Sequence, residues 1–238
     1  MQKGTRDQDS ALAAITDTVV SGVNGLGELS TFTVIGAAPG TAAGSVSVDF
    51  LPLAVAIDPV LNNDPTQTIA GITTASNLTS TNNSGLELLP LPAGSPTRVG
   101  MSLPTGIVFD ALNQVFVVAD STANNVNIVD PLTSEQVASI STGINPTSVD
   151  YNFDTSTLVT SNAASNTLSI LSYVCPPNPN GIANCPVPRV RDVLDPGSGV
   201  PVTPVIPGPN SIAIDPRLNL AVQIDQVNNR ILLVPLPN

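Results

Sequence analysis

The chain repeats one pattern with a period of about 42 residues. Each repeat opens with an apolar run that begins near a proline and ends at an aspartate, and a second apolar run follows an asparagine. That asparagine comes about 20 residues after the proline in three repeats and 31 residues after it, at Asn83, in the repeat from Pro52. The opening runs are Pro52–Asp58, Pro104–Asp110, Pro146–Asp154 and Pro209–Asp215. A regular period of this length restricts the chain to folds built from copies of one small unit.

The content of each repeat indicates β-strands. Apolar residues make up 42% of the chain but aromatic residues only 3%, so the core must consist of Val, Ile, Leu and Ala, which suit packed sheets. The 23 prolines and 17 glycines are spread between the apolar runs, which favours many tight turns. We therefore predict an all-β β-propeller of four-stranded antiparallel blades, with about five blades or partial blades.

The repeats also predict how the chain is divided. We expect a disordered tail over residues 1–10, a partial blade of three strands over 11–50, and blades that begin at about 52, 104, 146 and 209. Asn24-Gly25 predicts a hairpin in the partial blade. The repeat from Pro146 is followed by an insertion loop over 172–204, the most distinctive surface of the chain because loops often carry function.

The predicted strands do not add up to whole four-stranded blades, because the last repeat ends after its third strand. Three explanations stay open. The first blade is divided wrongly, the chain is part of a larger and incomplete ring, or a second chain completes the ring. An open ring would leave strand edges that favour pairing with another chain, which makes self-association an expected property.

Two middle repeats resemble the YVTN family of β-propeller repeats, which is related in architecture to the NHL repeats. The resemblance rests on Val117–Asp130 and Leu158–Leu171, each of which contains an Asn that opens an alternating run, and on the Gly143 and Pro146 that lead into the next strand. It is good over 104–171, fair over 209–234 and weak before 104. The resemblance implies a binding or scaffold module in an extracellular or surface protein.

Charge limits the partners. The formal net charge is −11, with seven Lys and Arg residues against eighteen Asp and Glu. Nucleic acids and anionic membrane surfaces attract clustered cations, so neither is expected to bind. No apolar run approaches the roughly 18–20 residues of a membrane span, and no secretory signal is visible near Met1. The acidity favours solubility, and cation binding is the more specific alternative.

The two cysteines, Cys175 and Cys185, bracket a proline-rich segment. The chain has no histidine to complete a zinc site, and the spacing is too long for a C-x-x-C redox motif. A disulfide that closes this loop is the preferred interpretation, with an entropic contribution of roughly 2–3 kcal/mol. It would place the protein in an extracytoplasmic compartment, whereas two unpaired thiols remain the alternative.

Most catalytic classes lack their residues. The absence of histidine excludes Ser-His-Asp and Cys-His catalysis, and the single lysine, Lys3, lies in the predicted tail. No phosphate-binding glycine motif is present. We therefore assign no catalytic residue and no cofactor.

The recurring polar residues are expected to stabilise turns. Aspartate at the end of a strand accepts hydrogen bonds from the backbone amides that follow it, and asparagine tolerates left-handed backbone. These structural roles are predicted for Asp58, Asp110, Asp154, Asp215, Asn125, Asn166 and Asn229.

Calcium is the alternative for two of the aspartates. Asp120 and Asp225 open turns that also contain asparagine, and such oxygen ligands suit calcium, although no EF-hand spacing is present. A calcium-dependent, lactonase-like hydrolase with carboxylates in the central channel is therefore the alternative function. Its acid–base pair cannot be assembled from the three glutamates. Besides Glu28 these are Glu87, which is predicted to face away from the core, and Glu135, which is placed in a turn. The preferred function is non-catalytic binding, scaffolding or self-assembly with a protein partner.

Overall fold

The computed structural model of the chain is all-β, and the residues that it describes form nineteen strands in five antiparallel sheets. It describes residues 10–11, 18–24, 28–33, 42–47, 51–58, 68–75, 84–91, 94–165, 167–172, 189–194, 212–225 and 230–236. Among these residues no helix is long and apolar enough to cross a membrane.

Each sheet is one blade whose strands follow one another in chain order. Blade 1 contains β1 (Ser10–Ala11), β2 (Thr18–Asn24), β3 (Glu28–Thr33) and β4 (Ala42–Ser47). Blade 2 contains β5 (Leu51–Asp58), β6 (Thr68–Ala75), β7 (Gly85–Leu91) and β8 (Thr97–Gly100). Blade 3 contains β9 (Pro104–Asp110), β10 (Val115–Asp120), β11 (Asn125–Asp130) and β12 (Glu135–Ser141). Blade 4 contains β13 (Pro146–Asn152), β14 (Thr157–Asn162), β15 (Thr167–Ser172) and β16 (Arg189–Leu194). Blade 5 contains β17 (Ile212–Asp215), β18 (Leu220–Asp225) and β19 (Arg230–Pro235).

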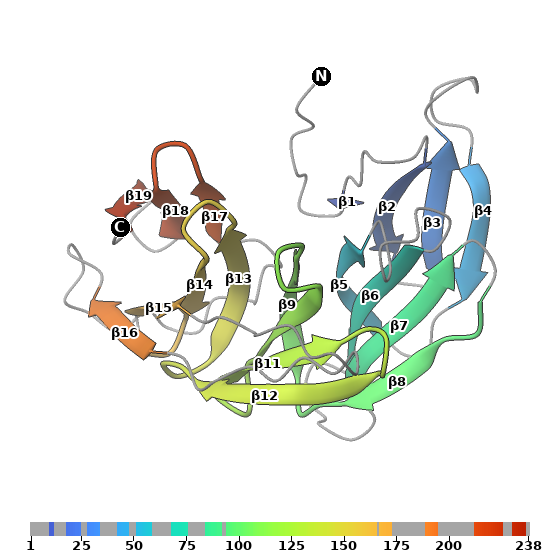
Figure 1. Ribbon diagram of the computed structural model, residues 1–238, viewed down its shortest axis with the longest axis horizontal. Coiled ribbons are helices and arrows are strands. Elements are labelled where there is room, and N and C mark those ends of the chain that lie inside the picture. The colour runs from blue at the N-terminus through green and yellow to red at the C-terminus, as the bar shows by residue number, and fades with distance from the viewer. Residues whose placement is uncertain are drawn as a thin grey trace.

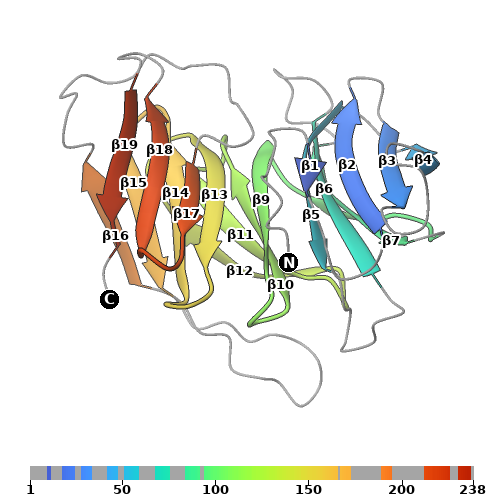
Figure 2. The ribbon, with the colours of Figure 1, turned by 90° about the horizontal axis from the view of Figure 1, so that it is seen from above.

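The blades form an arc (Figures 1 and 2). The first strands, β5, β9, β13 and β17, lie side by side on the inside of the arc, and the last strands lie toward its outside. Blades 1 and 5 stand apart at the two ends of the arc in both views. The predicted β-propeller of four-stranded antiparallel blades, about five in number, is confirmed, and its arrangement is an open arc.

Two details differ from the sequence-based division. Blade 1 has four strands, because the two residues of β1 pair with Ser21 and Val20 of β2; the partial blade of three strands was wrong. The segment 172–204 is not wholly a loop, since it contains β16, which pairs along its full length with β15. The missed strands are short or lack a clear alternation of apolar residues, which hid them from pattern analysis.

The hydrogen-bond registers align the blades position by position. Asp120 of blade 3 pairs with Pro104 on one side and Asn125 on the other, and Asn162 of blade 4 pairs with Pro146 and Thr167 in the same way. Asn125 and Thr167 are therefore equivalent positions. This alignment lets one blade serve as an internal control for another.

The core lies between the blades. One apolar cluster joins blades 2 and 3, another joins blades 3 and 4, and a third joins blades 4 and 5. Every residue of β10 is buried because a neighbouring blade covers each face of blade 3. Alternation along β7 does place Glu87 on the face opposite to the core residues Leu86 and Leu88, as predicted, but that face is covered as well, and the Glu87 side chain is only 2% exposed.

Candidate functional site

The turn after β9 shows how the recurring aspartates act. Asp110 is fully buried, and its Oδ1 accepts hydrogen bonds from the backbone N–H of Leu112 at 2.9 Å and of Asn113 at 3.1 Å. Its Oδ2 accepts one from Asn113 Nδ2 at 2.6 Å. The turn ends at Gln114 in left-handed backbone, with a φ of 56°. The carboxylate therefore closes the turn between the first two strands of the blade.

Blades 4 and 5 use the same turn with one change of residue. Asp215 Oδ1 accepts from the N–H of Arg217 at 3.0 Å and of Leu218 at 3.3 Å. In blade 4 the closing residue is Asn152, whose Oδ1 accepts from the N–H of Asp154 at 3.0 Å. Asp154 is exposed and acts there as the donor, so its predicted turn-closing role was wrong. Proline-to-aspartate spacing misled because the equivalent position, two residues earlier, holds asparagine.

The remaining turn candidates have different surroundings. Asp58 is buried at the end of β5, and residues 59–67 lie outside the described residues. Asn125 is the first residue of β11, whereas the left-handed residue of that turn is Asn124, with a φ of 56°. Asn166 and Asn229 lie outside the described residues. In the sequence they come directly before Thr167 and Arg230, the residues that are equivalent to Asn125 by register.

Asp120, the first calcium candidate, is engaged by the backbone. Its Oδ2 accepts from the N–H of Ser102 at 2.8 Å, and its Oδ1 accepts from Leu103 at 2.9 Å and from Ala123 at 3.2 Å. The carboxylate thus ties the segment between blades 2 and 3 to the end of β10. The second candidate, Asp225, ends β18, and its side chain lies outside the described residues. Within the described part of the chain no three acidic, His or Cys side chains are grouped as a metal site would require.

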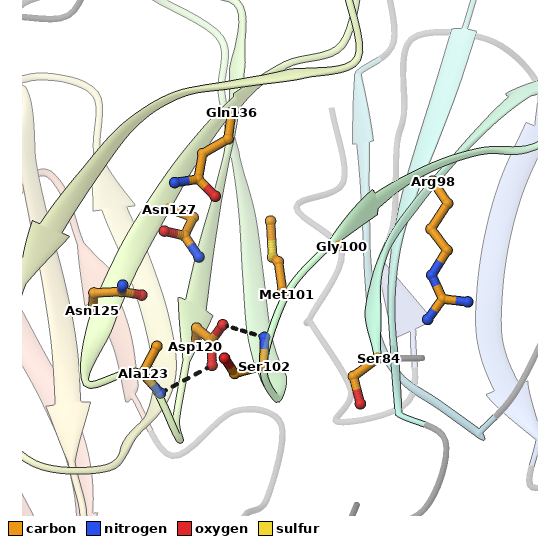
Figure 3. Close-up of a pocket in the computed structure, with 10 residues that line it drawn as sticks. All are labelled: Ser84, Arg98, Gly100, Met101, Ser102, Asp120, Ala123, Asn125, Asn127 and Gln136. Atoms are coloured by element: carbon orange, nitrogen blue, oxygen red, sulfur yellow. Dashed lines mark hydrogen bonds between the residues drawn. The ribbon is translucent and has the colours of Figure 1, made fainter. Parts of the chain in front are cut away.

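A cavity of about 660 Å³ opens between blades 2 and 3, beside Asp120. We call it the interblade crevice; Figure 3 shows Ser84 and Arg98 on one side, the amide side chains of Asn125, Asn127 and Gln136 on the other, and Met101 between them. Arg98 lies on β8 directly opposite Glu87 of β7. The lining of the crevice therefore combines one guanidinium, one carboxylate bound by backbone amides, and several neutral amides.

Two acceptor atoms in the crevice have no hydrogen-bond partner. Asn127 is 3% exposed, and the Oδ1 atoms of both Asn125 and Asn127 are buried without a donor. Buried acceptors of this kind are rare in folded proteins because each costs about 1–3 kcal/mol. The repeat pattern predicts only a turn role for Asn125 and no role for Asn127, although the Asn-Val-Asn alternation places both on one face of β11.

The same positions in blade 4 are fully hydrogen-bonded. Thr167 and Ser169 replace the two asparagines, and Asn162 donates from Nδ2 to both, at 3.0 and 2.9 Å. Ser169 Oγ also accepts from the N–H of Gly143, at 3.0 Å. The polar side chains between blades 3 and 4 thus hydrogen-bond to one another, whereas the Oδ1 atoms of the two equivalent asparagines between blades 2 and 3 have no donor.

Among the described residues, seven of the eight exposed large apolar side chains fall into two groups, and the eighth, Ile144, lies in the connection between β12 and β13. Four stand on turns at one end of the propeller: Leu112, Leu132, Phe153 and Leu218. Single exposed apolar residues of this kind are common on protein surfaces. Three others, Ile224, Ile231 and Leu233, lie on paired strands of blade 5, with exposures of 40%, 64% and 61%. We call these three the outer face of blade 5.

The outer face of blade 5 is the counterpart of a surface that is buried in the other blades. Ile231 pairs with Ile224 as Val126 pairs with Ala119 in blade 3, so Ile231 and Leu233 occupy the places of Val126 and Ile128. Those two residues are fully buried against blade 4, and their blade 4 equivalents, Leu168 and Ile170, are 1% and 5% exposed. The same positions therefore change from core to surface at the end of the arc.

The two predicted glutamates whose side chains are described lie on different blades. Glu135 begins β12 and is exposed, Glu87 is buried within blade 2, and the side chain of Glu28 lies outside the described residues. Cys175 and Cys185 also lie outside the described residues, in the connection between Ser172 and Arg189. Ser172 of β15 pairs with Arg189 of β16, and both cysteines come between these two residues in the sequence.

No family model and no curated protein sequence matches the chain. Many solved structures are similar in fold, for example two that match most of this chain. One is a chain in the crystal structure of a mitotic checkpoint complex, with a TM-score of 0.66, 12% identity, and coverage of 93% of this chain and 60% of that chain. The other is a functionally unknown protein from Desulfotomaculum acetoxidans, with a TM-score of 0.62, 14% identity, and coverage of 95% and 68%.

These likenesses show the fold alone, because function lies in sites that unrelated members of a fold do not share. The chain spans about 60% of the length of the checkpoint-complex chain. Its five blades thus match part of a longer chain.

Proposed function

We propose that the chain is a non-catalytic β-propeller scaffold that assembles through the outer face of blade 5. The observation that carries the proposal is the contrast between Ile231 and Leu233, at 64% and 61% exposure, and their equivalents Val126 and Ile128, which are fully buried. In blade 3 the side chains at these positions pack against the neighbouring sheet. The contiguous apolar surface that they form on blade 5 is therefore suited to contact another sheet.

The occupant that we favour is a second copy of this chain. The outer face is aliphatic at all three of its positions, so two copies can bring the same surfaces together without opposing like charges. A contact of this kind is isologous and closes as a two-fold dimer. The net charge of −11 opposes association at low ionic strength, and salt should therefore strengthen the dimer.

The described carboxylates support a structural rather than a catalytic role. Asp110, Asp120 and Asp215 each accept two or more backbone N–H groups. On the inner strand β13, Asp150 accepts from the N–H of Tyr151 at 2.9 Å and of Ile214 at 2.8 Å. Carboxylates held in this way join strands and blades. A calcium-dependent lactonase would instead need carboxylates directed at a metal or at water.

The finer features of the proposal concern location. An extracytoplasmic protein of the YVTN kind agrees with a disulfide between Cys175 and Cys185. Because Ser172 and Arg189 pair, Cys175 stands three residues beyond one end of the ladder and Cys185 four residues beyond the other. A disulfide would therefore close a hairpin at nearly matching positions. Intact mass after alkylation, with and without reductant, would report whether the thiols are paired.

Light scattering over a range of concentrations tests the assembly. We expect the wild-type chain to approach twice its monomer mass of 24.3 kDa, and a variant with Ile231→Asp and Leu233→Asp to stay monomeric at every concentration. The matched control replaces two exposed apolar residues on turns, Leu112→Asp and Leu218→Asp, and should assemble as the wild type does.

Two results would refute assembly through the outer face of blade 5. One is a wild-type chain that stays monomeric in high salt, and the other is a control variant that loses assembly while the blade 5 variant keeps it. Calcium-dependent hydrolysis of a simple lactone, lost on chelation, would refute the non-catalytic role and favour the lactonase alternative.

A further inference from the structure

We infer that the interblade crevice binds a small uncharged ligand rich in hydroxyl groups, of the size of a mono- or disaccharide. The inference is independent of the proposed assembly, since the crevice lies between blades 2 and 3 and assembly is proposed to use the outer face of blade 5. Its volume of about 660 Å³ is within the usual range for small-ligand sites, roughly 300–1,000 Å³.

The unpartnered acceptors point to a ligand that donates hydrogen bonds. Asn127 Oδ1 is buried in a side chain that is 3% exposed, and Asn125 Oδ1 is buried beside it on the same face of β11. Residues two apart on a strand are separated by about 7 Å. One ligand that satisfies both acceptors must therefore carry donors at two separated positions, as a sugar ring does.

The charges around the crevice favour a neutral ligand. Asp120 is the carboxylate that lines it, and three backbone N–H groups already bind that carboxylate. Arg98 is in register with Glu87 on the neighbouring strand, so the cation of the lining already has an acidic residue beside it. A charged ligand would lose its hydration without gaining a new counter-ion, which is costly in a partly buried site.

The remaining lining residues match the chemistry of a hydroxyl. Gln136 and the asparagines carry both a donor amide and an acceptor oxygen, and a hydroxyl group can pair with either. Ser84 and Ser102 add hydroxyls, and Met101 supplies an apolar surface between the two sides (Figure 3). The equivalent place between blades 3 and 4 has Thr167 and Ser169 bound to Asn162, so the chain can close such a place and does not do so here.

The test uses the full chain and a defined set of probes. Saturation-transfer NMR and calorimetry would be run with D-glucose, D-galactose, N-acetyl-D-glucosamine and maltose, beside two charged sugars, D-glucuronate and D-glucosamine. At least one neutral probe should bind, and each charged sugar should bind at least fivefold more weakly than its neutral parent. Binding of no probe, or tighter binding of a charged sugar, would overturn the inference.

Two variants locate the ligand. Asn127→Leu should weaken the best probe at least tenfold, and it introduces the residue that blade 5 carries at this position, Leu232. Gln136→Ala, at an exposed position, should weaken it at least threefold without affecting folding. Glu135→Gln is the control: it removes a charge from the neighbouring residue, which does not line the crevice, and should leave the affinity unchanged.

Stability separates a binding role for Asn127 from a structural one. Because its buried Oδ1 has no partner in the protein, Asn127→Leu should leave the melting temperature of the ligand-free chain unchanged or higher. A clearly lower melting temperature, or unchanged probe affinity in this variant, would overturn the assignment of Asn127 to the ligand.

Discussion

Asp120 on β10 reaches back seventeen residues to the backbone of Leu103, whose N–H it binds at 2.9 Å. With the bonds to Ser102 and Ala123, one buried carboxylate holds the passage from blade 2 to blade 3 and the end of β10 together. The structure therefore gives this side chain a mechanical role between blades.

Replacement of Asp120 should be costly. Asp120→Ala would leave three backbone N–H groups without their acceptor, and we expect the free energy of unfolding to fall by about 3 kcal/mol. Asp120→Asn should lose about half as much, because Asn162 occupies the same position in blade 4. Urea denaturation would measure both. Equal stability of the alanine variant and the wild type would contradict the role.

The same variant addresses calcium. Since the Asp120 carboxylate already accepts three hydrogen bonds, we expect millimolar calcium or a chelator to leave the wild-type melting temperature unchanged. A calcium-dependent rise in melting temperature that disappears in Asp120→Asn would show that the ion competes with the backbone for this carboxylate.

Blades 3 and 4 should be sensitive to a methyl group at Gly106. A Cβ atom there would lie 3.0 Å from Ser148 Cα and 3.2 Å from Val149 N, both backbone atoms of β13. Backbone in a paired strand cannot easily move, so Gly106→Ala should destabilise by about 2 kcal/mol. Gly71→Ala should cost less, because a Cβ there meets the side chains of Ile107 and Phe116. Thermal denaturation of the two variants tests this order. A larger fall in melting temperature for Gly71→Ala than for Gly106→Ala would contradict it.

Tyr151 should make the stability depend on alkaline pH. Burial, and then the negative charge of Asp110, raise its pKa from 10 to about 12. Below pH 10 the folded and unfolded states both keep the tyrosine proton, and the contribution of Tyr151 to the free energy of unfolding is fully present. It is lost as the pH rises from 10 toward 12, because the unfolded state releases the proton first. Between pH 9 and 11 the wild type should lose about 1 kcal/mol more than Tyr151→Phe. Urea titrations at the two values test this, and parallel losses would contradict the shifted pKa.

The fold could be predicted further than the sites could. The period and the proline-led runs predict β9 and β13, whose first residues are Pro104 and Pro146. Strand pattern alone cannot say which face of a blade a neighbour covers. Glu87 was therefore placed outside the core, and the outer face of blade 5 was not recognised, although Ile231–Val234 was read correctly as a strand.

The candidate sites depend on contacts between repeats. In the sequence Asn127 is one more polar residue of a turn-rich repeat; the structure shows that its buried Oδ1 lacks a donor, whereas the equivalent Ser169 in the next blade is hydrogen-bonded by Asn162. Asp154 fits the aspartate pattern, yet Asn152 closes the turn, because a hydrogen bond depends on register rather than on residue type.

Assembly through the outer face of blade 5 can be tested most directly by methyl NMR on dilution. If two copies meet through blade 5, the methyl signals of Ile224, Ile231 and Leu233 should shift together as the concentration falls, while those of Leu112 and Leu218 stay constant. Invariant blade 5 signals across a concentration range in which the mass changes, or shifts confined to the turn residues, would contradict the proposal.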